Sequence, residues 1–283
     1  MFMDKMRKQL CVEDLKKKAI EIRKDILLML EVAKSGHTGG SLSVVDILVA
    51  LYYYKIKINP KKPNWTCRDK VILSKGHACP ALYAVLANLG YFPREELWTL
   101  RKLGSRLQGH PEVNLPGIEA STGSLGQGLS IANGMAIANK MNKSDSKVYC
   151  IMGDGETNEG QVWEAAMTAS HHNLDNVCGI VDFNKMQIDG FCCDVKDLEP
   201  FSEKWISFGW HTVEIDGHDM GSIVGVLDEL DKIKGKPKMI IAHTIKGKGV
   251  SFIENQVKWH GIAPKKDELE KALKELDNQL KTL

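Results

Sequence analysis

Two polar side chains stand at the ends of consecutive apolar runs in this 283-residue chain. Asp154 lies between Gly153 and Gly155 in the stretch IMGDGETNEG, and Asn184 ends the next apolar run thirty residues later. If both runs are neighbouring strands of a parallel sheet, the two side chains face one crevice at the carboxyl ends of the strands, where such sheets bind ligands. A carboxylate and an amide oxygen suit a hard cation such as Mg²⁺ or Ca²⁺.

The surroundings of Asp154 add a diphosphate to this prediction. Mg²⁺ usually completes its coordination with water, a backbone carbonyl and phosphate oxygens. A helix expected to begin near Glu159 would direct free N–H groups and about half a positive charge toward the same place. Because Gly-Asp-Gly is also ordinary turn chemistry, the prediction of a metal-bound diphosphate depends on Asn184 as well.

Histidines beside glycines form a second set of candidates. Of the nine histidines, four follow a glycine: His37, His77, His110 and His218. A glycine-containing loop can bring an imidazole to a ligand, and imidazole titrates in the range that proton transfer needs. We expect His218 to be a structural loop residue. The adjacent His171 and His172 resemble a metal pair, but they end a predicted helix, where positive charge is favoured, and we leave them out of the site.

Short apolar runs that alternate with helical segments must position these residues. The runs predicted as strands are 71–74, 147–152, 177–183, 211–215 and 238–244. The segments predicted as helices are 12–34, 43–54, 79–89, 94–103, 125–142, 159–171, 200–208, 219–233 and a C-terminal helix at about 266–283. Such alternation indicates a parallel sheet covered on both faces. The predicted fold is therefore α/β, a three-layer α/β/α arrangement with a mostly parallel sheet of about five or six strands.

The tail and the composition bound the organisation of the chain. Leucines recur with heptad spacing at positions 269, 273, 276, 280 and 283, and we expect this stripe to pack on its own domain. Without a repeat or a linker, residues 1–283 are predicted to form a single domain.

The charge and cysteine content exclude several classes of protein. A formal charge of +2 from 38 basic and 36 acidic residues gives no electrostatic reason to expect nucleic acid or a membrane surface. Seven cysteines without metal-binding spacing indicate reduced thiols. No stretch has the apolar core of a signal peptide or the length of a membrane span. We therefore expect a cytoplasmic protein.

Several motifs in order resemble one enzyme family. Gly-Asp-Gly followed by Asn at this distance is the signature of thiamine-diphosphate enzymes, and the chain is similar to the transketolases among them. The segments that carry the resemblance are SGHTGGSLS (35–43), LSKGHACPALY (73–83), GHPE (109–112), STGSLGQGLS (121–130) and WHGIAP (259–264). The resemblance implies the thiamine-diphosphate-binding fold, as a diphosphate-binding (PP-type) domain. It also implies transfer of a two-carbon ketol unit between sugar phosphates, as in the pentose phosphate pathway.

The resemblance further implies roles for individual residues. The catalytic residues would be His37, His110 and His260. His37 and His260 would contact substrate and assist proton transfer, and His110 would lie against the cofactor and the two-carbon intermediate. The residues at the cofactor would be His77, Gly123, Ser124, Leu125, Gly155, Glu159, Asn184, Lys246 and His260. The metal ligands would be Asp154, Asn184 and the backbone carbonyl of Met186. Ser124 and Thr38 replace prolines that are usual in the family, and Glu159 resembles an acidic residue at the interface between active sites.

The motifs account only for the diphosphate-binding half of a transketolase. In this class a glutamate on a pyrimidine-binding domain activates the thiamine ring, and that domain would follow the last motif. Only about twenty residues do so here, against roughly 100–150 for a typical domain. We therefore expect the N-terminal subunit of a split transketolase, whose C-terminal partner subunit completes an α2β2 heterotetramer. The groups that hold the sugar phosphates belong to the partner, so donor and acceptor stay unassigned.

Three alternatives stay open at this point. The chain can be a subunit of a 2-oxo acid dehydrogenase, but the Gly-His loops disfavour that class. It can belong to a deoxyxylulose-phosphate synthase, but ACPALYA stands where that family carries an HKxLTGR-like segment. A non-catalytic cofactor-binding subunit is the third alternative, and the presence of the metal ligands and the histidines disfavours it.

Overall fold

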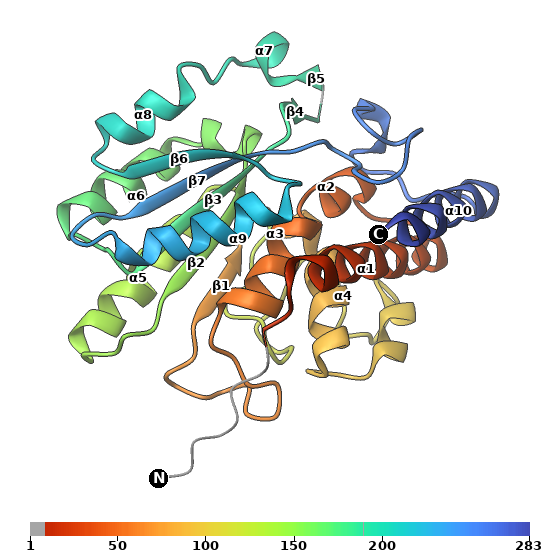
Figure 1. Cartoon of the computed structure of the whole chain (residues 1–283), viewed down its shortest axis with the longest axis horizontal. Helices are drawn as coiled ribbons and strands as arrows, with labels where there is room; N and C mark the ends of the chain where they lie inside the picture. The colour runs from red at the N-terminus through yellow and green to blue at the C-terminus, as the bar shows by residue number, and fades with distance from the viewer. Residues whose placement is uncertain (1–8, 189) are drawn as a thin grey trace.

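A computed structural model describes residues 9–188 and 190–283 of the chain (Figure 1). Its centre is a five-stranded sheet in the order β1-β2-β3-β7-β6, with all neighbouring strands parallel. The strands are β1 (Lys70–Leu73), β2 (Val148–Gly153), β3 (Val177–Phe183), β6 (His211–Asp216) and β7 (Lys238–His243). Each predicted strand is confirmed to within one residue at either end.

Side chains on alternate strand positions enter two separate apolar cores, one on each face of the sheet. Val71 and Leu73 belong to one core and Ile72 to the other, as the two-residue period of a strand requires. The first core lies under α1 (Val12–Ala33), α3 (Val45–Ala50), α4 (Cys79–Leu89) and α9 (Met220–Glu229). The second lies under α5 (Gln127–Met141), α6 (Gly160–His171) and α8 (Phe201–Ser207). The predicted three-layer α/β/α architecture is therefore confirmed.

The tail helix α10 (Lys266–Thr282) lies along α1 (Figure 1). Leu269 and Leu276 are buried, and Leu273 and Leu280 pack partly buried against the first core, whereas Leu283 is exposed. The leucine stripe thus packs on the chain itself, as its spacing predicts. No helix in the described part of the chain is long and apolar enough to cross a membrane.

The predicted helix at 43–54 is wrong in its bounds. The chain forms a six-residue helix α2 (Thr38–Ser43), then α3, then a π-helix (Leu51–Lys55). The α-helical hydrogen-bond pattern is interrupted at Val44, which lies between the two helices and has a ψ of −3°. The glycines of the Thr38-Gly39-Gly40 start of α2 weaken the helical signal, because glycine is a poor helix former.

The predicted helix at 94–103 is also wrong, since only a 3₁₀ helix (Arg94–Thr99) forms there. It ends because Leu100 is extended and Arg101 takes a positive φ of 60°. Further short 3₁₀ helices span Gly76–Ala78, Gly155–Asn158, Leu230–Lys232 and Val257–Trp259. A small hairpin, β4 (Met186–Gln187) with β5 (Gly190–Phe191), and the single turn α7 (Cys192–Val195) follow β3 without having been predicted.

Candidate active site

The carboxyl ends of β1, β2, β3 and β7 lie side by side, because these four strands are consecutive in the sheet. A candidate residue follows each strand: His77 after β1, Asp154 after β2, Asn184 after β3 and Lys246 after β7. The condition that the sequence left open, that the strands before Asp154 and Asn184 are neighbours, is met by the β2–β3 pairing. One edge of the sheet therefore gathers all four.

The turns after β2 and β3 are joined through the Asp154 carboxylate. Its Oδ1 accepts a hydrogen bond from Gly155 N at 2.8 Å, and its Oδ2 accepts one from Lys185 N. Asn184 Oδ1 accepts from Met186 N at 3.1 Å. Each of these oxygens retains a lone pair, and both side chains are nearly fully buried. The turns after two neighbouring strands thus both present side-chain oxygen atoms at the same edge of the sheet.

The electrostatics of this turn fit a bound cation. Burial raises the pKa of Asp154 to about 6, and the charge of Asp182 contributes to the rise. Burial would also raise the pKa of Asp182, but the Lys75 ammonium bonded to it lowers that pKa overall. Among the described residues no lysine or arginine forms a salt bridge with Asp154. A divalent cation would offset this buried, unpaired carboxylate.

The protein itself supplies few metal ligands. Within the described ranges, no three His, Cys, Asp or Glu side chains come together as a metal site. A carboxylate, an amide oxygen and a backbone carbonyl are the sparse set that Mg²⁺ uses when phosphate oxygens and water complete its coordination. The donor atoms present therefore fit a metal that arrives with a phosphate ligand.

Three imidazole rings form a cluster at the same edge. The ring centroids of His37 and His77 are 5.0 Å apart, and the ring of His260 lies 5.5 Å from each. Helix α2 can approach them because it begins with glycines: a Cβ on Gly40 would lie 3.5 Å from His77 Nε2, and one on Gly39 would lie 3.0 Å from Lys246 Cγ. A Cβ on Gly39 would also lie 3.1 Å from the carbonyl oxygen of Trp259, so a larger side chain at this position would displace Lys246 or the segment before His260.

The three imidazoles are neutral at pH 7. Burial is the main cause, and it lowers the pKa to about 4 for His37, about 2 for His77 and about 3 for His260. The positive charges of Lys75 and Lys246 lower all three pKa values further, and Arg101 also lowers that of His37. A neutral imidazole can accept a proton at one nitrogen and donate from the other, as general acid–base chemistry requires.

Two buried lysines place positive charge beside the cluster. Lys246 Nζ lies 2.8 Å from His260 Nδ1, and Lys246 is only 2% exposed. Burial, with repulsion from Lys75, lowers the pKa of Lys246 to about 8. The site therefore concentrates ammonium groups where an anion would relieve their repulsion, which suits a diphosphate.

Thr38 links the loops of two of the histidines. Its Oγ1 donates a hydrogen bond to the backbone carbonyl of Ile262 at 2.5 Å. This bond fastens the segment that carries His260 to the start of α2, directly after His37. The proline that the family resemblance implies at this position would have no hydroxyl and could not make this contact.

Several other candidate residues predicted from the sequence are less buried than the three-ring cluster. His110 packs on Gly123, since a Cβ there would lie 2.9 Å from His110 Cδ2, and its charge acts on the pKa of His37. The carbonyl of Leu125 accepts from Gln161 Nε2 at 3.0 Å. Ser124, His110 and Glu159 are exposed. His110 is therefore not part of the three-ring cluster, and these three residues line the open side of the edge.

Sequence reasoning missed three buried residues that organise the site. Lys75 and Asp182 form an ion pair with side chains 2% and 0% exposed. Glu156 accepts hydrogen bonds from Ser74 Oγ, from Gly126 N at 2.9 Å and from Gly153 N at 3.0 Å. Glu156 thus joins the loop before α5 to the turn after β2. The sequence signals that could have revealed the ion pair were the place of Lys75 directly before Gly76-His77 and that of Asp182 inside an apolar run.

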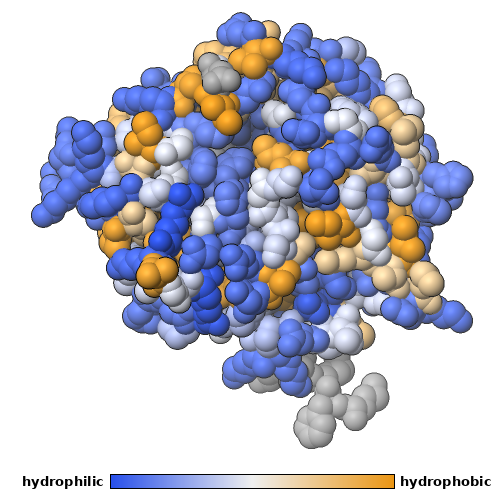
Figure 2. All heavy atoms as spheres, turned by 180° about the vertical axis from the view of Figure 1, so that it is seen from behind, coloured by the Kyte–Doolittle hydropathy of each residue, from blue (hydrophilic) through white to orange (hydrophobic). Residues whose placement is uncertain are grey.

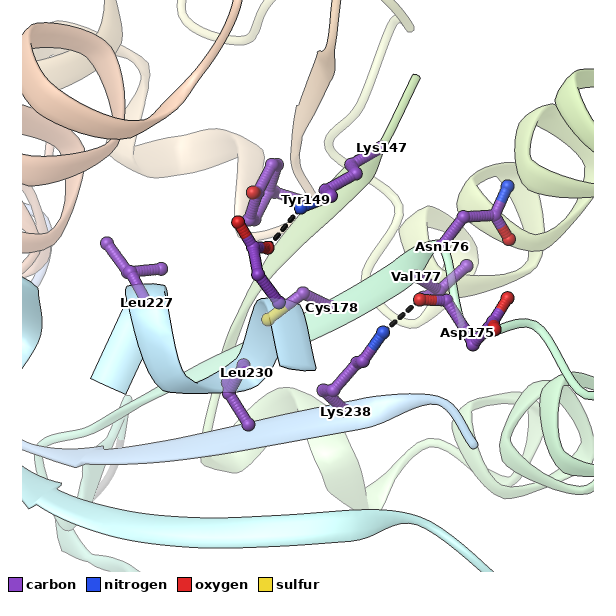
Figure 3. A pocket seen from close by; sticks show the side chains of 10 residues that line it. Lys147, Tyr149, Asp175, Asn176, Val177, Cys178, Leu227, Leu230 and Lys238 are labelled. Carbon is purple, nitrogen blue, oxygen red and sulfur yellow. Dashed lines mark hydrogen bonds and ion pairs between the residues drawn. The ribbon is translucent and has the colours of Figure 1, made fainter. Parts of the chain in front are cut away.

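A cavity at the opposite, amino-terminal edge of the sheet is not part of this site (Figure 3). It encloses about 20 Å³, which is room for a single water molecule. Its two lysines are occupied, because Lys147 pairs with Asp231 and Lys238 donates to the carbonyl of Asp175. The Asn176 side-chain oxygen in the lining is buried without a hydrogen-bond partner in the part of the chain that the structure describes, so the cavity suits one bound water and is too small for a larger ligand.

The fold and the site together define a cofactor-binding α/β protein, and comparisons with known proteins identify the class. Residues 16–281 match the family described as transketolase, thiamine diphosphate binding domain. The 6-deoxy-6-sulfo-D-fructose transketolase subunit SqwG of Clostridium sp. (strain MSTE9) is 46% identical over 94% of this chain and 97% of its own length. One subunit of the apulose-4-phosphate transketolase of Phocaeicola vulgatus is 42% identical over 96% of this chain and 97% of its own length.

A solved structure agrees with both relatives. The transketolase from Campylobacter jejuni superposes with a TM-score of 0.88 at 34% identity, over 93% of this chain and 43% of the solved chain. This chain therefore belongs to the transketolase family, in which it is a thiamine diphosphate binding subunit of a transferase. The family, the fold and the subunit character that the sequence predicted are confirmed.

Proposed function

We propose that this chain transfers a two-carbon ketol unit from a ketose phosphate to an aldose phosphate, using thiamine diphosphate with Mg²⁺ or Ca²⁺ and a second subunit. The observation that carries the proposal is that two groups of side chains, one suited to a metal and one suited to proton transfer, lie at the same edge of the sheet. The buried oxygens of Asp154 and Asn184 lie there together with three neutral imidazoles and the Lys246 ammonium. Metal binding and proton transfer can both be served from this edge.

The residues at the strand ends would hold the cofactor. Asp154, Asn184 and the carbonyl of Met186 would bind the metal, and Lys246 and Gly155 would lie at the diphosphate. The segment Gly123-Ser124-Leu125 and His77 would contact the rings, with Glu159 at their margin. When bound, thiamine diphosphate supplies the carbon nucleophile that carries the two-carbon unit.

The histidines would move protons at the substrate. His37 and His260 are neutral at pH 7, so each can take a proton from a sugar hydroxyl and return it to a developing alkoxide. Lys246 beside His260 would stabilise negative charge as it forms. His110, on the open side, would act on the same hydroxyl groups from the opposite direction.

A partner subunit would close the open side of the site. Both relatives reported above are named as subunits, and this chain matches nearly their whole length. Exposed apolar side chains at the β4–β5 hairpin and α7, namely Ile188, Phe191 and Val195, lie directly after the metal turn. Figure 2 shows apolar side chains gathered at the top of the molecule, where Figure 1 draws this hairpin. Two copies of each subunit would form two sites, an α2β2 assembly.

The experiment that tests the proposal is a ketol-transfer assay with purified subunits. Xylulose 5-phosphate serves as donor and ribose 5-phosphate as acceptor, with thiamine diphosphate and Mg²⁺ present. The assay compares this chain alone, its copurifying partner alone, and the mixture. We expect turnover only in the mixture. Robust turnover by this chain alone would contradict the two-subunit proposal, and a cofactor-loaded mixture inactive on all ketose phosphates would contradict the reaction.

A further inference from the structure

Three buried polar residues form a continuous chain of hydrogen bonds behind the site. Arg23 on α1 binds Asp46 on α3 through two nitrogen–oxygen contacts of 3.1 and 2.5 Å. His218, in the loop after β6, places Nδ1 2.7 Å from Asp46 Oδ2. The side chains of all three residues are at most 10% exposed. Burying charged side chains costs free energy unless each is paired, so the role of these three residues needs an explanation.

The two ends of this hydrogen-bonded series, His218 and Arg23, both bind the loop that follows β7. The backbone N–H of Ile245 donates to His218 Nε2 at 2.8 Å, and Arg23 Nε donates to the carbonyl of Lys248 at 3.1 Å. Lys246 lies between the two contacts. The Arg23–Asp46–His218 chain therefore holds the loop on either side of the lysine that faces His260.

The hydrogen-bond pattern selects one form of His218. Nε2 accepts from an amide N–H, so it carries no proton, and Nδ1 must then carry the proton and donate it to Asp46. Asp46 is suited to accept: burial alone would raise its pKa, but Arg23 and His218 lower the pKa to about 2. An N–H at Nε2 would oppose the N–H of Ile245 and break the contact.

The loop needs such support because of what it carries. Gly247 and Gly249 have positive φ values of 85° and 96°, and glycines lose more conformational freedom on folding than other residues, so ordering the backbone beside Lys246 is costly. The ammonium of Lys246 is buried and is repelled by Lys75. Without a fixed backbone, this ammonium would gain free energy by swinging out to water.

We propose that His218, held as its Nδ1–H tautomer by Asp46 and Arg23, is a positioning residue that fixes the Lys246 loop and so presents the Lys246 ammonium to the cofactor's diphosphate. The inference rests on the proposed function for the role of Lys246, whereas the tautomer and the loop contact stand on the geometry of this chain alone. His218 thus acts through another residue and touches no reacting atom.

Two substitutions of His218 separate the two halves of its role. In His218→Gln, the side-chain oxygen can occupy the place of Nε2 and still accept from Ile245. In His218→Asn, the shorter amide can meet Asp46 but cannot reach Ile245. We expect His218→Asn to weaken thiamine diphosphate binding to the full chain about tenfold, the cost of one lost buried hydrogen bond, and His218→Gln to stay within about threefold.

A double-mutant cycle with Lys246→Met decides whether the effect passes through the lysine. If it does, His218→Asn should cause no further loss of affinity in the Lys246→Met background. An equal loss in both backgrounds would overturn the proposal. The matched control is His243→Gln, because His243 forms a similar pair with Glu214 at 2.7 Å but is exposed on the neighbouring strand.

Readouts that need no cofactor complete the test. Nitrogen-15 NMR of the histidine-labelled chain should show His218 as the Nδ1–H tautomer, and hydrogen exchange at the Ile245 amide should accelerate in His218→Asn but not in His218→Gln. An Nε2–H tautomer would overturn the inference even if His218→Asn fails to fold. A wild-type chain that binds no thiamine diphosphate with its partner present would contradict the proposed function instead.

Discussion

At the scale of single residues, the described part of the chain places two buried aspartates in the site, of which Asp182 pairs with a lysine and Asp154 does not. Asp182 is bonded to Lys75, Ser43 and Thr244, whereas Asp154 accepts backbone N–H groups and has the raised pKa of a carboxylate without a compensating charge. The two aspartates at neighbouring strand ends therefore have different tasks. Asp182 anchors the loops, and Asp154 is left available for a cation.

This difference predicts that cofactor binding depends on the metal through Asp154. In Asp154→Ala the diphosphate loses its bridge to the protein, and we expect its affinity in Mg²⁺ to fall about 100-fold or more. Calorimetric titration of thiamine diphosphate into the chain and its partner measures this, and EDTA should produce the same loss in the wild type. The control is Asp145→Ala, an exposed aspartate paired with Lys57. An unchanged affinity in Asp154→Ala would remove the metal assignment.

The depressed histidine pKa values predict how stability depends on pH. His37, His77 and His260 have folded-state pKa values below the ordinary value of 6.5. At these three sites the unfolded chain therefore binds more protons than the folded chain between about pH 6.5 and pH 4, so their contribution to the free energy of unfolding falls as the pH drops through that window. The pKa of Asp154, which burial raises to about 6, opposes part of this fall. Urea unfolding at several pH values measures the slope.

The same experiment on variants assigns the slope to the cluster. His37→Gln, which removes one buried titrating group, should flatten the decline below pH 6.5, while His171→Gln at the exposed end of α6 serves as the matched surface variant. If the slope below pH 6.5 is the same in His37→Gln as in the wild type, the His37 imidazole does not stay neutral in the folded protein.

At the scale of elements, short α2 is the part that brings separate loops together. Its glycines admit His77 and Lys246, and its first residue, Thr38, bonds to the carbonyl of Ile262. We predict that Thr38→Val costs about 1 kcal/mol of stability, the usual value of one hydrogen bond, but lowers turnover more strongly because His260 loses its placement beside His37. Chemical denaturation and steady-state assays on the assembled enzyme separate the two effects. Thr38→Ser keeps the hydroxyl and should behave as wild type.

The elements also show which features the sequence could predict. The five strands were predictable because each is an apolar run that ends at a polar residue such as Asp154 or Asn184. The Lys75–Asp182 pair was not, because its members are 107 positions apart and meet only since β1 and β3 lie on either side of β2. Glu156 was missed for the same reason, because Ser74 and Gly126 come from segments that only the strand order brings beside it. His218 was predicted as a structural loop residue, but its partners Asp46 and Ile245 are equally distant in sequence and could not be predicted.

At the scale of the whole molecule, the two edges of the sheet differ in character. The carboxyl edge holds buried charges and, on the β4–β5 hairpin and α7, the exposed Phe191 and Val195, whereas the amino edge holds the small cavity with paired lysines. We therefore expect a partner that completes the site to dock on the carboxyl edge, where these apolar side chains are exposed.

This asymmetry predicts that apolar side chains of the hairpin and α7 stabilise the subunit complex. Replacing Phe191 and Val195 together by serine should weaken association with the partner by about tenfold or more, since burying two such side chains contributes roughly 1–3 kcal/mol each. Both are exposed in this chain, so its own thermal unfolding should change little. Analytical ultracentrifugation or titration of labelled partner measures the association. The control is Met141→Ser, an apolar residue at the end of α5 near the amino edge that is more exposed than Phe191 or Val195. Equal losses in the double variant and in Met141→Ser, or none in either, would place the interface elsewhere on the molecule.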